Sequence, residues 1–263
     1  MTKPPLFFIH GMWSTPKVWD GMRAHFEARG HVVHVPHLPF HERDADNRRD
    51  DAPDRLLSTT GVQDYVDALI ASARDVGEPP VIIGHSMGGM LAQKLAEAIG
   101  ARGLILLSPA PTASTGSLAI APLRTTFGLT SNVRGKWWKS PTMIDEERAR
   151  WGIFNEVPAK ETEEAIADLV WDSGRVLYQI SMPWADKSKA THVDYEKLDM
   201  PALVVVGDVD RITPVATARA TVRKLSGEVD YVELDGVGHW LFHDPVAGRV
   251  TSAMDNFLNM LGG

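Results

Sequence analysis

The motif Gly-His-Ser-Met-Gly-Gly at residues 84–89 carries the clearest chemical signal in the sequence. It follows a short apolar run, Val81–Ile83, and opens an apolar pattern with helical spacing over Met87–Ile99. A serine at such a sharp strand-to-helix turn holds its hydroxyl clear of the sheet, and the helix directs its positive end at a developing oxyanion. We therefore interpret Ser86 as a nucleophile. The alternative is a phosphate-binding glycine turn, but the lysine and the spacing of a P-loop are absent from this stretch of sequence.

A serine nucleophile needs a base, and the base needs an acid that orients it. His239 stands in a glycine-containing loop directly after the last strand-like run, where its imidazole can turn back toward Ser86. The acid is expected after the preceding run, where both Asp208 and Asp210 qualify. Only one of the two should face His239. We favour Asp210, and interpret Asp208 as a loop cap or as an ion-pair partner of Arg211.

Two backbone N–H groups should stabilise the oxyanion. One is that of Met87, the residue directly after the proposed nucleophile. The other should come from the loop after the first apolar run, which reads His-Gly-Met-Trp at residues 10–13. We choose Met12 as this second donor, with Trp13 as the second choice.

The elements that must position these residues alternate between short apolar runs and longer helical patterns. Continuous apolar runs indicate strands that are covered on both faces, and the alternation predicts a parallel α/β sheet. Helices are predicted over Val62–Val76, over Met87–Ile99 and from about Pro245 to Leu261. The strand-like runs are Leu6–Ile9, Val32–Val35, Val81–Ile83, Leu104–Leu107, Leu203–Val206 and Tyr231–Leu234.

Two stretches interrupt this alternation. Residues 42–55 are dense in charges of both signs, which is typical of a solvated loop with internal ion pairs; an interaction loop is the alternative. Residues 112–198 have helical patterns and hold five of the eight tryptophans, so we expect an insertion that covers one end of the sheet. At least half of these tryptophans should pack inside the insertion. The candidates for a substrate pocket are Trp13, Trp137, Trp138, Trp184 and Trp240.

Composition excludes several classes of protein. With 44% hydrophobic and 23% charged residues, the chain of 263 residues is typical of a globular protein. The absence of cysteine excludes disulfides, thiolate metal sites and a cysteine nucleophile. A net charge of −7 argues against nucleic acid or an anionic membrane as the main partner. The N-terminal residues resemble neither a signal peptide nor a membrane span, so we expect a cytoplasmic protein; monomer and dimer both stay open.

Together these motifs resemble the α/β-hydrolase-fold serine hydrolases over nearly the whole chain. His10-Gly11, residues 84–89, Gly207-x-x-Asp210 and Gly238-His239 follow that family's order and approximate spacing. The resemblance implies a Ser-His-Asp mechanism without metal or organic cofactor. It also implies a core of residues 1–111 and 199–263, with residues 112–198 as a helical cap after the family's sixth strand. Because only five residues precede Leu6, we expect about six parallel strands, with the family's first two missing.

The resemblance also narrows the chemistry. Ser86 excludes the epoxide hydrolases and haloalkane dehalogenases of the family, whose nucleophile is a carboxylate. The tryptophan-rich insertion favours a small-molecule carboxylic ester with a small to medium apolar acyl or alcohol group. Alternatives are a monoacylglycerol lipase or lysophospholipase, whose serine motif is similar, and a lactone hydrolase; thioesters, amides and carbon–carbon bonds stay open. From other classes, a lyase, a perhydrolase or a ligand receptor with slow turnover could use the same residues.

Overall fold

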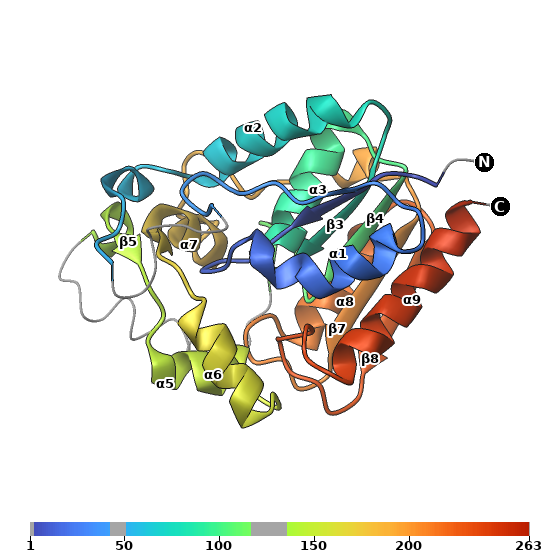
Figure 1. The fold of residues 1–263 in the computed structure, drawn as a ribbon. Coiled ribbons are helices and arrows are strands. Elements are labelled where there is room, and N and C mark those ends of the chain that lie inside the picture. Colours follow the sequence, from blue (N-terminus) through green and yellow to red (C-terminus); the bar gives the residue numbers. More distant parts are fainter. Residues whose placement is uncertain (1–2, 43–50, 117–135, 263) are drawn as a thin grey trace.

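The computed structural model describes residues 3–42, 51–116 and 136–262. Its centre is a six-stranded sheet in which all neighbouring strands are parallel, in the order β2-β1-β3-β4-β7-β8 (Figure 1). This confirms the six predicted parallel strands. Parts of the charged run (43–50) and of the insertion (117–135) lie outside the described residues. The strands are β1 (Leu6–Ile9), β2 (Val33–His34), β3 (Val81–His85), β4 (Gly103–Leu107), β7 (Ala202–Gly207) and β8 (Val229–Leu234).

Helices cover both faces of the sheet because successive side chains of each strand point to opposite sides. Leu6 and Phe8 belong to a buried apolar cluster that includes side chains of α1 and α9, whereas Phe7 and Ile9 belong to a second cluster that includes side chains of α2, α3 and α8. Among the described residues, no helix combines the length and the apolar composition needed to cross a bilayer. The helices are α1 (Asp20–Glu27), α2 (Val62–Ala73), α3 (Met87–Ile99), α8 (Val215–Lys224) and α9 (Val246–Leu261), with the 3-10 helices η1 (Pro16–Trp19), η2 (Arg55–Ser58) and η3 (Arg74–Val76).

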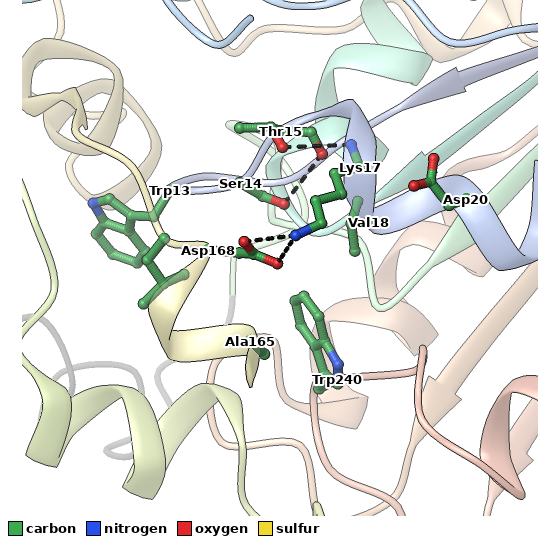
Figure 2. Close-up of a pocket in the computed structure, with 10 residues that line it drawn as sticks. Trp13, Ser14, Thr15, Lys17, Val18, Asp20, Ala165, Asp168 and Trp240 are labelled. Atoms are coloured by element: carbon green, nitrogen blue, oxygen red, sulfur yellow. Dashed lines mark hydrogen bonds and ion pairs between the residues drawn. The ribbon is translucent and has the colours of Figure 1, made fainter. Parts of the chain in front are cut away.

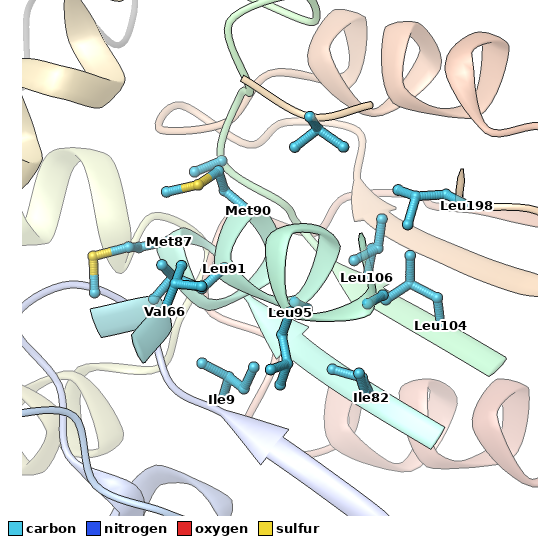
Figure 3. Packing of buried hydrophobic residues seen from close by; sticks show 14 of the residues in the cluster. Ile9, Val66, Ile82, Met87, Met90, Leu91, Leu95, Leu104, Leu106 and Leu198 are labelled. Carbon is cyan, nitrogen blue, oxygen red and sulfur yellow. The ribbon is translucent and has the colours of Figure 1, made fainter. Parts of the chain in front are cut away.

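The central helix α3 is buried along most of its length. Met90, Leu91 and Leu95 have no exposed surface and pack against the apolar side chains of β3 and β4 (Figure 3). Full burial of one such side chain stabilises the fold by about 1.5–3 kcal/mol. The start of α3, directly after Ser86, is therefore fixed in place by the core of the protein.

The segment between β4 and β7 leaves the sheet and builds a small core of its own. Its apolar cluster includes Ile144, Phe154 and Leu169, and Trp13 from the loop after β1 packs into it. A short antiparallel ladder joins β5 to β6. The described elements are η4 (Trp137–Lys139), β5 (Pro141–Thr142), α5 (Glu146–Arg148), η5 (Ala149–Ile153), α6 (Ala159–Ala167), β6 (Asp172–Ser173), α7 (Gly174–Ser181) and η6 (Tyr195–Lys197).

A buried ion pair ties this segment to the sheet and its helices. Asp172 on β6 and His41 after β2 are both inaccessible to solvent, and His41 Nε2 lies 3.1 Å from Asp172 Oδ2. The hydroxyl of Tyr65 on α2 donates to Asp172 Oδ1 at 2.7 Å. Burial would lower the pKa of His41, but attraction to Asp172 outweighs it and raises that pKa. Burial would likewise raise the pKa of Asp172, but attraction to His41 and hydrogen bonds lower it.

The pair should make stability depend on pH. The raised pKa of His41 gives stability that is complete below the ordinary histidine pKa of 6.5 and is lost as the pH rises through the folded-state value. The lowered pKa of Asp172 gives stability that is complete above 3.8 and is lost as the pH falls through the folded-state value. Between pH 3.8 and pH 6.5 both groups are charged in the folded protein. In this range His41→Gln should lower the free energy of unfolding by about 3–5 kcal/mol.

Urea denaturation at about pH 5.5 and about pH 9 measures this cost. The gap between wild type and His41→Gln should be larger at the lower pH. His34→Gln is the matched control, because His34 is a partly exposed histidine on β2. A gap that stays constant or widens at the higher pH would contradict the assignment of the charge to His41.

Candidate active site

Ser86 occupies a strained turn between β3 and α3. Its backbone φ of 55° and ψ of −122° lie in a region that non-glycine residues rarely adopt. A Cβ atom at Gly84 would overlap the Gly88 carbonyl, and one at Gly88 would overlap the Ile9 carbonyl. The glycines therefore permit the close approach of β3, α3 and β1 that forces Ser86 outward, as the sequence predicts.

His239 and Asp210 form a buried hydrogen bond at the ends of neighbouring strands. Asp210 follows β7, His239 follows β8, and His239 Nδ1–H donates to Asp210 Oδ2 at 2.8 Å. Burial would raise the pKa of Asp210, but attraction to His239 and its hydrogen bonds lower that pKa, so the carboxylate stays ionised. Asp208 is exposed and accepts only a long bond, 3.4 Å, from Val237 N. The structure thus brings Asp210, and not Asp208, against the histidine.

Two further residues hold this pair: Thr213, which sequence analysis did not single out, and His85, which we expect from its place beside the nucleophile to pack or hydrogen-bond rather than to act on substrate. The hydroxyl of Thr213 lies 2.9 Å from Asp210 Oδ2 and 3.2 Å from His239 Nδ1, and the Thr213 amide donates to Asp210 Oδ1 at 2.8 Å. His85 Nε2–H donates to the His239 carbonyl at 3.1 Å. Burial and the neighbouring His239 lower the pKa of His85 to about 3, so this histidine is neutral. The spacing Asp-x-x-Thr carried a signal for Thr213, whereas the contact of His85 depends on the fold.

The loop after β1 lies directly against the serine. A Cβ at Gly11 would sit 3.1 Å from Ser86 Cβ, so only glycine allows this approach without a shift. Among the described residues, the amides of Met12 and Met87 have no hydrogen-bond acceptor. The Trp13 amide, by contrast, donates to Asp172 Oδ2 at 3.0 Å. Of the two candidates in this loop, Met12 has the amide that is free to bind an oxyanion.

Ser86 and His239 open into one small cavity of about 30 Å³. It lies between the ends of the strands and the β4–β7 segment, which contributes Ile153 and Leu169 to its wall. Its other apolar lining residues are Met12, Trp13, Ile212 and Trp240. Within the described part of the chain, no group of three or more histidine and carboxylate side chains is arranged to hold a metal ion.

A second, larger cavity of about 270 Å³ adjoins the first and shares Trp13, Leu169 and Trp240 with it. Figure 2 shows the ammonium group of Lys17 directed at the carboxylate of Asp168, and the two lie 2.7 Å apart. The ion pair joins the start of η1 to the end of α6 beside an otherwise largely apolar space. Neither Ser86 nor His239 lines this larger cavity.

The predicted pocket tryptophans divide into two groups. Trp13 and Trp240 line both cavities. Trp137 and Trp138 contact Tyr178 inside the β4–β7 segment and line neither cavity. Trp184 is 79% exposed and also lines neither.

Comparison with known proteins identifies the family. Residues 6–249 match the model of the Alpha/beta hydrolase family, and the chain belongs to this family. The parallel sheet, with the serine after β3, the aspartate after β7 and the histidine after β8, agrees with this assignment. No curated protein sequence matches the chain significantly.

Solved structures of the same fold include several enzymes. A monoacylglycerol lipase from Paleococcus ferrophilus is 19% identical, with a TM-score of 0.68 over 98% of this chain and 96% of its own. A pyrethroid hydrolase from Sphingobium faniae JZ-2 is 20% identical, with a TM-score of 0.72 over 97% of each chain. A methylesterase from Arabidopsis is 13% identical, with a TM-score of 0.68 over 96% of this chain and 98% of its own. At these identities the likeness establishes the fold.

The two aspartates after β7 give a direct test of the site. Asp210→Asn should lower kcat by about four orders of magnitude, because the amide no longer holds His239 in the tautomer that leaves Nε2 free. Asp208→Asn, the matched control on the same loop, should stay within a few-fold of wild type. The test compares kcat for the wild type, Asp210→Asn and Asp208→Asn on an ester that the wild type cleaves. The reverse ranking would assign the role of orienting acid to Asp208.

Proposed function

We propose that the protein is a serine hydrolase that cleaves carboxylic esters through an acyl-enzyme. The observation that carries the proposal is the opening of Ser86 and His239 into one small cavity, with His239 bonded from behind to the buried Asp210. This geometry supports the assignment of Ser86 as nucleophile, His239 as base and Asp210 as orienting acid for acyl transfer. Ser86, Asp210 and His239 follow β3, β7 and β8, and β4 lies between β3 and β7 in the sheet.

Acylation begins at Ser86. Because Nδ1 of His239 donates to Asp210, Nε2 is the nitrogen left to take the serine proton. Ser86 Oγ attacks the ester carbonyl, and the amides of Met12 and Met87 stabilise the oxyanion. One donor of this kind is worth about 2.7–4 kcal/mol of transition-state stabilisation. His239 then gives its proton to the departing alcohol, and the acyl group stays on Ser86.

Deacylation repeats the same steps with water. His239 Nε2 takes a proton from a water molecule, which attacks the acyl carbonyl, and the carboxylic acid leaves as the proton returns to Ser86. The negative charge of Asp210 stabilises the imidazolium in both halves. Its lowered pKa, which follows because attraction to His239 and hydrogen bonds outweigh its burial, supports this role.

The shape of the site supports a small to medium apolar ester. A cavity of about 270 Å³ is slightly smaller than most small-molecule pockets. Trp13, Leu169 and Trp240 give it an apolar wall, and Lys17 and Asp168 are among the polar residues that line the rest. The similar structures also include enzymes named for esters, among them a methylesterase and a monoacylglycerol lipase. We further propose that residues 112–198 form a cap, because Ile153 and Leu169 close the space over Ser86.

Hydrolysis of p-nitrophenyl esters from acetate to palmitate tests the reaction. The wild type should release p-nitrophenol, and Ser86→Ala should fall to background with its fold intact, because alanine lacks the hydroxyl that attacks the ester. Circular dichroism of both proteins is the control for folding. Equal release by the variant would refute the role of Ser86. No release by the wild type at any chain length would leave two choices, a pocket that demands a specific substrate or a ligand receptor.

Chain-length preference tests the pocket. The wild type should prefer the shorter esters, and Trp240→Ala should shift the optimum to longer chains, because Trp240 lines both cavities and its removal joins them. Trp184→Ala is the matched control, since Trp184 is exposed and away from both cavities. The kcat/KM series for the three proteins measures the shift. A wild-type optimum at palmitate would instead support the monoacylglycerol lipase or lysophospholipase alternative.

A further inference from the structure

Trp13 holds the loop after β1 in a strained shape. Its backbone φ is 59°, in the left-handed region, which costs a bulky non-glycine residue free energy and persists only where neighbours enforce it. Both of its backbone polar groups are bound by the β4–β7 segment. The Trp13 amide donates to Asp172 Oδ2 at 3.0 Å, and the Trp13 carbonyl accepts from Val170 N at 3.0 Å.

These contacts fix the position of the proposed oxyanion donor. Met12 lies between Gly11, which is pressed against Ser86, and Trp13, which is bound to Asp172. With both ends held, the intervening peptide has little freedom to rotate. Release of Trp13 would let the residue relax toward ordinary backbone angles and turn the Met12 amide away from the serine.

Asp172 is itself held in place, so that it can keep the Trp13 amide in a fixed position. It is wholly buried, and its two oxygens are surrounded by donors from separate parts of the fold. Oδ1 accepts from the hydroxyl of Tyr65 at 2.7 Å and from Ser173 N at 2.6 Å, while Oδ2 faces His41 and the Trp13 amide. A carboxylate held from so many sides cannot swing, so the bond to Trp13 is rigid.

We propose that Asp172 is a positioning residue, which holds Trp13 in its left-handed conformation and thereby aims the Met12 amide at the reacting carbonyl. The inference rests on the proposed function, since it assumes that Ser86 is the nucleophile and that Met12 is an oxyanion donor. Asp172 lies in the β4–β7 segment and contacts no reacting atom. This segment therefore does more than cover the cavity, because it completes the geometry of the site.

The rate at which an alkyl fluorophosphonate labels Ser86 tests the inference without a known substrate. In this reaction a bond forms between Ser86 Oγ and phosphorus, the phosphorus–fluorine bond breaks, fluoride leaves, and the serine proton passes to His239. The phosphoryl oxygen occupies the oxyanion site. Misplacement of the donor by about 1 Å should slow the reaction up to about 100-fold.

Two changes to the protein test the contact, and only the second separates it from the fold, because the first also removes the partner of the buried His41. Asp172→Ala removes the acceptor. Incorporation of the α-hydroxy acid analogue of tryptophan at position 13 turns that amide into an ester and deletes only the N–H group, so every side chain stays in place. Arg175→Gln is the control, because Arg175 bonds the same segment to the Thr59 carbonyl away from the serine. Circular dichroism and thermal melting report on the fold of each protein.

We expect both changes to slow labelling 10- to 100-fold, with Arg175→Gln close to wild type. On p-nitrophenyl butyrate the ester-linked protein should lose kcat with little change in KM, which a loosened fold alone would not produce. Unchanged labelling by the ester-linked protein would overturn the role of Asp172 while leaving the proposed function standing. A wild type whose Ser86 is not labelled would overturn the proposed function and this inference with it.

Discussion

The close approach of α3 to β3 and β1 is the constraint on which the rest of the site depends. Three main chains can come this near only because residues 84 and 88 have no side chains, and the consequence is a left-handed backbone at Ser86. Such strain costs about 1–3 kcal/mol, and burial of the apolar face of α3 offsets it. The helix cannot relax without giving up its contacts in the core, so the serine stays pointed out of the sheet.

Two buried carboxylates fix the positions of the other groups of the site, the histidine and the loop after β1. Asp210 orients the histidine through its side chain, and Asp172 holds the loop after β1 through the Trp13 backbone. Each is ionised because nearby cationic or hydrogen-bonding partners outweigh the cost of burial. Asp210 belongs to the sheet and Asp172 to the segment inserted between β4 and β7. The geometry of the site therefore depends on both parts of the chain.

Much of this could be predicted from the sequence because the signals were local. The strands β1, β4 and β7 are almost wholly apolar, whereas the edge strands β2 and β8 include polar residues. The helix Met87–Ile99 begins and ends where its pattern does. The glycines that permit the serine turn lie within two residues of Ser86. The strand before Asp208 and Asp210 reduces the candidates for the acid to these two residues. Which tryptophans line a pocket could not be predicted in this way: Trp137 and Trp138 were candidates, but they contact each other and Tyr178 and line neither cavity.

Contacts between distant parts of the chain gave no such signal. Asp172 lies 159 positions from Trp13 and 107 from Tyr65, and nothing in its sequence neighbourhood indicates a buried carboxylate. Four histidines lie between residues 31 and 41, and the sequence does not indicate that His41 is the one that pairs with Asp172. Exposure of Trp184 depends on tertiary packing, which composition does not reveal.

A crystal structure of the protein with a trifluoromethyl ketone of short chain length would examine the arrangement most directly. Such a ketone forms a tetrahedral adduct with an activated serine. We predict continuous density from Ser86 Oγ to the ketone carbon, with the oxyanion about 2.7–3.1 Å from the amides of Met12 and Met87. An unmodified Ser86 beside bound ketone, or an oxyanion turned away from both amides, would contradict the account.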